Sequence, residues 1–253
     1  MSDLVYGIHA VRHTLLHSPQ DALELWLKID WHARGISEIR TLALKNGIAI
    51  QEVPDATLDK LANDGVHQGV VLRRRTPKLR DERDLVSILA ERPAMALLLV
   101  LDGIQDPQNL GACLRTADAA GVDAVIVPMH RGAGVTGATR KAASGAAETV
   151  SLIAVRNLAR SLREIRDAGI WVVGTADDAE QTLYDVDFNR STALVVGSEN
   201  RGLRRLTREH CDVLASIPMQ GNVESLNVSV TTGIGLFEAV RQRRCQSPSR
   251  RPT

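Results

Sequence analysis

The sequence has few aromatic residues, few cysteines and no long apolar run. Only 3% of its 253 residues are Phe, Trp or Tyr, so any core must be built from aliphatic side chains. The cysteines (Cys113, Cys211 and Cys245) are far apart and form no CxxC pair, which favours free thiols over a zinc or disulfide framework. No apolar run is long enough to span a bilayer, and the first residues lack the pattern of a signal peptide. We therefore expect a soluble, cytoplasmic protein with no membrane attachment.

The charge is nearly balanced, with 31 Lys and Arg residues against 30 Asp and Glu residues, a net charge of +1. Only five of the basic residues are Lys. Arg contacts phosphate through two N–H groups at once and stacks on bases, so this bias is compatible with RNA binding. A GC-rich coding bias produces the same excess. Composition alone leaves nucleic-acid binding open.

The chain is predicted to contain two domains. In residues 1–75, helical periodicity alternates with short strand-like runs, which indicates a small α/β domain. The charged, Pro-containing segment 76–93 is predicted to be a linker that runs into a short helix. Residues 94–245 form the second domain, and the tail 246–253 is expected to be disordered.

The second domain contains six strongly apolar strand segments separated by helical segments. This alternation is typical of an α/β fold with a mostly parallel sheet that is covered on both faces. Ligands bind such sheets outside the carboxyl ends of the strands. The predicted strands are residues 95–102, 124–128, 151–155, 171–176, 193–199 and 213–219.

Three of these strands end in loops rich in Gly and in neutral polar side chains, with one Arg and one Glu among them. Asn and Ser cap helices and Gly forms turns, which explains part of each loop. It does not explain why all three loops should lie at one end of the sheet. The residues are Asn109, Gly111 and Arg115, then Gly197, Glu199 and Gly202, then Ser225, Asn227 and Ser229.

A Gly-rich segment, Gly132 to Gly137, has the spacing of a dinucleotide-binding loop. Four residues separate it from the preceding strand, no acidic residue follows at the required distance, and the Gly-Lys-Ser/Thr ending of a phosphate-binding loop is missing. We interpret it as a loop that places Arg131, Arg140 and Lys141 for RNA contact.

Two further patterns have ordinary structural explanations. His9, His13 and His17 lie on one stripe of a predicted helix, but no further ligand converges on them, so we predict a solvated face and no metal site. Asp102 and Asp106 flank a turn and could suggest acid catalysis. Asp106 with Pro107 is instead predicted to shape the turn.

Three long segments resemble the three motifs of the SpoU/TrmH-type 2′-O-ribose RNA methyltransferases, which belong to the SPOUT superfamily. They are LDGIQDPQNLGACLRTADAAGVDAVIV, LVVGSENRGL and SIPMQGNVESLNVSVTTGIGLFEA. The similarity extends to YGIHAV and HQGVVL in the first domain and covers nearly the whole chain. Within the family, the sequence most resembles the bacterial enzymes that methylate a guanosine ribose in 23S ribosomal RNA.

The resemblance implies S-adenosylmethionine as methyl donor, bound in a deep trefoil knot at the C-terminal end of the catalytic domain 94–245. It also implies a homodimer and an L30e-like domain, residues 1–75, that holds the 23S rRNA. Backbone contacts to the cofactor are implied at Gly197, Ile217 and Leu226, with Met219 and Thr175 as neighbours. Neutral donors could contact adenine and ribose without an added cation repelling the sulfonium.

The resemblance also implies that Arg115 is essential. Because a guanidinium is a poor base at neutral pH, we predict that Arg115 binds the adjacent phosphate and stabilises the developing alkoxide, with Glu199 orienting it. Asn109, Ser225 and Asn227 are predicted to hold the loops and the hydroxyl group.

Two alternatives differ in substrate or in activity. A tRNA ribose methyltransferase has the same catalytic core but usually lacks the first domain. A non-catalytic rRNA-binding assembly factor could keep the fold and lose the activity. The presence of Asn109, Arg115, Glu199 and Asn227 argues against such a loss.

Overall fold

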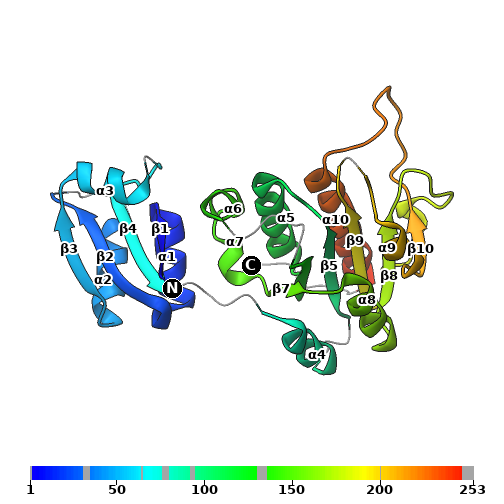
Figure 1. Ribbon diagram of the computed structural model, residues 1–253, viewed down its shortest axis with the longest axis horizontal. Coiled ribbons are helices and arrows are strands. Elements are labelled where there is room, and N and C mark those ends of the chain that lie inside the picture. Colours follow the sequence, from blue (N-terminus) through cyan, green and yellow to red (C-terminus); the bar gives the residue numbers. More distant parts are fainter. Residues whose placement is uncertain are drawn as a thin grey trace. The chain divides into compact units, whose positions relative to one another are not determined.

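The computed structural model describes residues 2–30, 35–63, 65–75, 80–91, 95–129, 136–199 and 201–246. The predicted disordered tail lies outside this set from residue 247 onward. The chain divides into two compact units, residues 1–78 and residues 79–253. Figure 1 shows the first unit in blue and cyan and the second from green to red.

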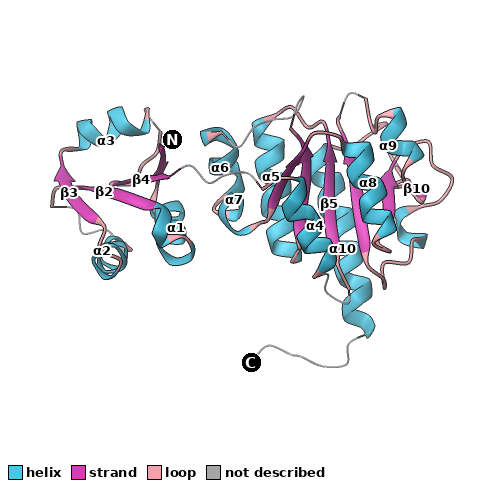
Figure 2. Cartoon of the chain, turned by 60° about the horizontal axis from the view of Figure 1, so that its bottom comes forward, coloured by secondary structure: helices cyan, strands magenta, loops and turns pink. Residues whose placement is uncertain are grey.

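The first unit is a four-stranded mixed sheet covered by three α-helices. The strand order is β1-β4-β2-β3, and only β2 and β3 run parallel. Helices α1 and α2 cover one face and α3 covers the other (Figure 2). The elements are β1 (Ser2–Tyr6), α1 (Ile8–His17), a 3₁₀ turn (Pro19–Asp21), β2 (Ala22–Lys28), α2 (Ile36–Lys45), β3 (Ala49–Val53), α3 (Asp55–Ala62) and β4 (Val70–Arg75).

Alternation along the central strand β4 divides the core of this unit. Val70 and Leu72 face α1 and α2 and pack with Val11, whereas Val71 faces α3 and packs with Leu58. This is the period of two expected for a strand that is covered on both faces. The short edge strand β1 was not predicted, because a run of five residues carries little periodic signal.

The second unit is a six-stranded, fully parallel sheet in the order β10-β8-β9-β5-β6-β7. All six predicted strands are present, and the predicted α/β class with a parallel sheet is confirmed. The strands are β5 (Leu97–Asp102), β6 (Ala124–Pro128), β7 (Leu152–Val155), β8 (Trp171–Thr175), β9 (Thr192–Gly197) and β10 (Val213–Ala215).

Helices cover both faces of this sheet. One face carries α4 (Glu82–Ala90), α8 (Leu158–Asp167) and the short α9 (Arg205–Glu209). The other carries α5 (Pro107–Ala120), α6 (Gly137–Ala143), α7 (Ala146–Thr149) and α10 (Val228–Gln246), and a 3₁₀ turn lies at Leu183–Asp185. Along β5, Leu97, Leu99 and Leu101 face the α5 side, and Leu98 and Val100 face the α8 side.

Two local features connect the sequence to this arrangement. Helix α4 falls inside the segment predicted as a linker, and its Leu85 and Leu89 pack into the core of the second unit. Asp106 caps α5, since its Oδ1 accepts a hydrogen bond from the Gln108 amide at 3.0 Å, which confirms its predicted structural role. Among the helices that the structure describes, none is both long and apolar enough to cross a membrane.

Candidate active site

The three polar loops meet at one end of the parallel sheet. Asn109 in the first turn of α5 donates a hydrogen bond to Glu199, which follows β9. Asn227, just before α10, donates from Nδ2 to Asn109 Oδ1 at 3.1 Å and to Glu199 Oε1 at 3.5 Å. Its own Oδ1 accepts from the backbone N and the hydroxyl of Ser229 at 2.8 and 2.6 Å. The predicted convergence of the three loops is confirmed.

The loop that carries Glu199 is a tight turn closed over Gly197. The Gly202 amide donates to the Ser198 carbonyl at 2.8 Å. A Cβ on Gly197 would lie 2.1 Å from the Gly202 carbonyl carbon, so only glycine allows the chain to fold back this closely. Position 197 therefore fixes the path of the turn that presents Glu199.

Asp102 anchors the far end of the same turn. It is the last residue of β5, pairs in register with Gly197 and has a fully buried side chain. Its Oδ2 accepts a hydrogen bond from the Arg204 amide at 2.9 Å, and its Oδ1 lies 3.4 Å from Arg204 Nε. A buried carboxylate needs such partners to offset its lost hydration.

A pocket of about 410 Å³ opens beside this junction, at the carboxyl ends of β8, β9 and β10. This volume is within the range of small-molecule sites, roughly 300–1,000 Å³. The segment between β10 and α10, which forms part of the wall, projects from the body of the unit (Figure 1). All five predicted cofactor residues line the pocket, together with two predicted catalytic residues: Thr175, Gly197, Ile217, Met219 and Leu226, with Glu199 and Ser225.

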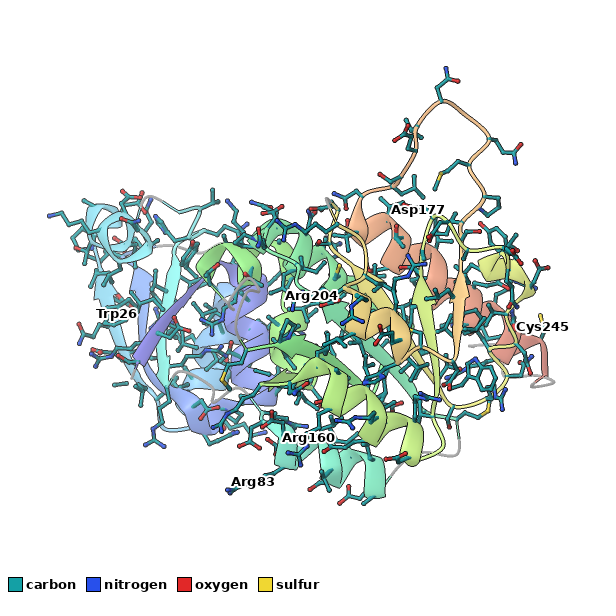
Figure 3. The ribbon with its side chains drawn as sticks, turned by 45° about the vertical axis from the view of Figure 1, so that its right-hand side comes forward. Trp26, Arg83, Arg160, Asp177, Arg204 and Cys245 are labelled. Carbon is teal, nitrogen blue, oxygen red and sulfur yellow. The ribbon has the colours of Figure 1, made fainter. Side chains whose placement is uncertain are left out.

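Five charged pocket residues were not predicted. Asp177 and Asp178 lie one residue beyond the end of β8, and Figure 3 shows Asp177 near the base of the projecting segment. Arg208 donates from both terminal nitrogens to the Asp178 carboxylate at 3.0 Å, and these hydrogen bonds lower the pKa of Asp178. Arg201 and Glu224 complete the set. The missed signal was a pair of acidic residues immediately after a buried strand of the same sheet.

The pocket combines an apolar wall with carboxylates and close backbone approach. Ile217 and Leu226 can contact a flat ring, and Gly197 exposes backbone to it. Asp177, Glu199 and Glu224 place three carboxylates around the same space, and Arg201 adds one cation. This set fits a ligand with an aromatic base and a cationic centre, such as S-adenosylmethionine. Among the described residues, no cluster of three or more His, Cys, Asp or Glu side chains could hold a metal ion.

Arg115 lies on the exposed side of α5 and contacts α6 instead of Glu199. Its Nη1 donates to Ser144 Oγ at 3.4 Å, just after α6 ends. Arg140 and Lys141 lie in the last turn of α6, which packs against α5. Three of the predicted RNA-contacting or catalytic cations are thus on neighbouring helices. The fourth, Arg131, lies outside the described residues.

Comparison with known protein families gives two matches that together span most of the chain. Residues 96–237 match the model of the SpoU rRNA Methylase family. Residues 4–79 match the model described as RNA 2′-O ribose methyltransferase substrate binding. The boundary between the two matches falls where the structure separates its two units.

Individual relatives are similar over nearly the full length. The protein named 23S rRNA (guanosine-2′-O-)-methyltransferase RlmB from Haemophilus influenzae is 52% identical over 244 residues, which cover 96% of this chain and 99% of that protein. The structure of the SpoU methyltransferase AviRb from Streptomyces viridochromogenes in complex with AdoMet aligns with a TM-score of 0.80 and 25% identity, covering 96% of this chain and 91% of that one. The A. aeolicus TrmH/SpoU tRNA modifying enzyme aligns with a TM-score of 0.56 and 33% identity, covering 65% of this chain and 83% of its own.

Proposed function

Because this chain belongs to the SpoU rRNA methylase family, we propose that it transfers a methyl group from S-adenosylmethionine to the ribose 2′-hydroxyl of a guanosine in 23S rRNA. The observation that carries the proposal is the hydrogen-bonded junction of Asn109, Glu199 and Asn227 beside the pocket. The full-length similarity to an enzyme named for this reaction supports the substrate. The tRNA modifying enzyme aligns with only 65% of the chain, which makes tRNA the weaker candidate.

We propose that the cofactor occupies the pocket at the ends of β8, β9 and β10. Gly197, Ile217 and Leu226 would contact its adenosine portion, with Met219 and Thr175 beside them. When bound, S-adenosylmethionine supplies an electrophilic methyl group on a sulfonium. Holding the ribose hydroxyl in line with that methyl group lowers the activation barrier, because the entropy of orienting the two groups is already lost on binding.

We assign the electrostatic part of the reaction to Arg115. Its side chain is exposed, and its one hydrogen bond to a described residue is a long one to a serine hydroxyl, so its other donors are available to RNA. A guanidinium can bind a phosphate through two N–H groups and stabilise an oxygen that becomes negative. Asn109, Ser225 and Asn227 would hold the loops in place, and Arg140 and Lys141 would extend the basic surface along α6.

We propose that the first unit holds the RNA substrate. The match of residues 4–79 to a substrate-binding family supports this role, and no group suited to methyl transfer was predicted there. A homodimer, a trefoil knot around the cofactor and a cytoplasmic location remain predictions from the resemblance. Native mass spectrometry would test the dimer.

Replacing Arg115 tests the assignment directly. We expect Arg115→Ala to keep the fold and the affinity for S-adenosylmethionine, because Arg115 does not line the pocket. Single-turnover methyl transfer should fall by roughly 10²–10³-fold, as for the loss of one preorganised donor. The assay uses radiolabelled S-adenosylmethionine and an unmodified 23S rRNA fragment. A near-normal transfer rate would contradict the role of Arg115, and the absence of any transfer by the unaltered protein would contradict the proposed function.

A further inference from the structure

A second hollow, of about 520 Å³, lies at the opposite end of β8 from the cofactor pocket. Trp171, the first residue of β8, lines this hollow, whereas Thr175, the last, lines the cofactor pocket. A strand rises about 3.3 Å per residue, so the two backbone positions are roughly 13 Å apart. The hollow is therefore separate from the proposed active site. Its other lining residues are Arg163, Arg166, Asp167, Gly169, Ile170, Arg190 and Asp212.

The arginines of the hollow differ in how their charge is compensated. Arg166 Nε lies 2.8 Å from Asp212 Oδ1, and the other oxygen of Asp212 accepts from the Val172 amide at 2.9 Å. The charges of Arg166 and Asp212 thus compensate each other, and Asp212 is also hydrogen-bonded to the sheet. Neither Arg163 nor Arg190 forms an ion pair with any residue that the structure describes. Both side chains are exposed.

The guanidinium of Arg190 lies over an aromatic ring. Its guanidinium carbon lies 4.1 Å from the ring centroid of Trp171, which is half-buried against the core. A cation over an indole face is attracted by the ring and keeps its N–H groups directed outward in the guanidinium plane. Stacking of this kind holds a cation in place without neutralising it, unlike a carboxylate.

Further basic residues lie on the same face of the unit. Helices α4 and α8 cover the same side of the sheet, and Figure 3 shows Arg83 of α4 and Arg160 of α8 on that side. Arg160 is paired with Glu164 at 2.9 Å, so it adds little free charge. Within the hollow itself, Arg163 and Arg190 are the arginines that no described carboxylate pairs.

We propose that this hollow binds the sugar-phosphate backbone of the RNA substrate, with Arg163 and Arg190 as its phosphate contacts. The inference rests on the proposed function, because it takes RNA as the ligand. Arg binds phosphate through paired N–H donors, and a stacked guanidinium also offers a flat surface to a base. After Arg166 and Asp212 pair, the hollow retains two cations and Asp167. This weak net charge suits one segment of a long polyanion better than a free phosphate. Such contacts position RNA without reading its sequence.

The test compares the full chain with an Arg163→Gln/Arg190→Gln double variant. Binding of a fluorescein-labelled, unmodified 23S rRNA fragment is followed by anisotropy over a series of KCl concentrations. We expect roughly tenfold weaker binding at low salt, and a slope of log K against log [KCl] that is smaller by about 1 to 2, as for one or two lost phosphate contacts. Single-turnover transfer at saturating RNA should be unchanged while KM for RNA rises, because the hollow lies away from the reacting groups.

Arg205→Gln provides a matched control. Arg205 is exposed on α9 and pairs with Glu209 at 2.6 Å, and it lines neither cavity. If the double variant keeps its melting temperature and binds RNA with the affinity and salt slope of this control, the inference is overturned. The same holds if the double variant loses binding to poly-glutamate but keeps its RNA affinity, since an acidic protein would then be the ligand. RNA binding without methyl transfer by the unaltered protein would instead contradict the proposed function.

Discussion

Replacing Asp102 with Ala should loosen the turn that carries Glu199. The turn is closed internally by the Gly202 amide and is attached to the sheet through the bond from the Arg204 amide to the buried Asp102 carboxylate. The substitution removes this attachment and leaves the amide without its acceptor. Gly197, Ser198 and Glu199 line the proposed cofactor pocket, whereas Asp102 does not. The substitution should therefore weaken cofactor binding without removing a side chain that lines the pocket.

The magnitude follows from two opposing effects. An amide that loses its acceptor on burial costs about 1–3 kcal/mol. Removing a buried carboxylate also removes the cost of its desolvation, and the Arg204 amide is only partly buried, so we expect the lower half of that range. The ion pair contributes little, since the Arg204 side chain is 43% exposed. The free energy of unfolding should fall by about 1–2 kcal/mol.

That loss should be visible in two measurements. For a unit the size of residues 79–253, about 1–2 kcal/mol corresponds to a melting temperature lower by roughly 2–8 °C. If the loosened turn must be ordered again when S-adenosylmethionine binds, at the same free-energy cost, the affinity should fall about 5- to 30-fold. Thermal unfolding and isothermal titration of the full chain give both values.

Arg204→Ala separates the backbone attachment from the side-chain ion pair. This variant keeps the Arg204 amide and the Asp102 acceptor, so its melting temperature and cofactor affinity should stay close to those of the unaltered protein. If Asp102→Ala and Arg204→Ala have equal effects on both measurements, the bond to the amide is not what holds the turn.

Three further outcomes follow from named contacts. Because Asn227→Ala removes hydrogen bonds to two other loops, it should raise the dissociation constant for S-adenosylmethionine or lower the transfer rate, with RNA affinity unchanged. Weaker RNA binding with normal cofactor binding and transfer would contradict this. Hydrogen bonds from Arg241 lower the pKa of Glu238, so this carboxylate stabilises the fold above its unfolded pKa, and the stability is lost as pH falls through the folded pKa. Glu238→Gln should therefore be less stable than the unaltered protein in urea at neutral pH, and the difference should shrink in acid; a pH-independent difference would refute the linkage. Burial raises the pKa of Cys113 to about 11. At pH 8, iodoacetamide should therefore label the exposed Cys245 well before Cys113 in the folded protein, as measured by mass spectrometry. Equal labelling rates would contradict the burial of Cys113.

The sequence predicted the strands of the second unit and the end of the sheet at which ligands bind. Aliphatic runs of five or six residues identify buried strands, and carboxyl ends of parallel strands share one edge. The resemblance to the methyltransferase family, and not the strand pattern, then named Gly197, Ile217 and Leu226 as residues around one space at that edge. Strand order was not predictable, because periodicity identifies the face of a strand but not its neighbours.

Contacts between elements account for most of what was missed. Asp102 appeared as one of two acidic residues near a turn, and its bond to Arg204 crosses 102 positions of sequence. Arg190 and Trp171 come together only because β8 begins beside the segment before β9. No local pattern encodes either contact. The predicted partnership of Glu199 with Arg115 failed to appear for the same reason, since helical spacing does not say which loop a side chain faces.

The partners that Glu199 does have explain why this site is rich in amides. An ion pair with Arg115 would cancel the charges of both groups and hold the arginine away from RNA. Asn109 and Asn227 instead hold the carboxylate through neutral donors, so no cation cancels its charge at the pocket wall where we propose that the sulfonium binds. Among the described residues, Arg115 has only a serine hydroxyl as partner, which leaves it available for the phosphate contact that we propose. Neutral side chains thus keep one anion and one cation apart, so that each could contact the proposed ligand of opposite charge.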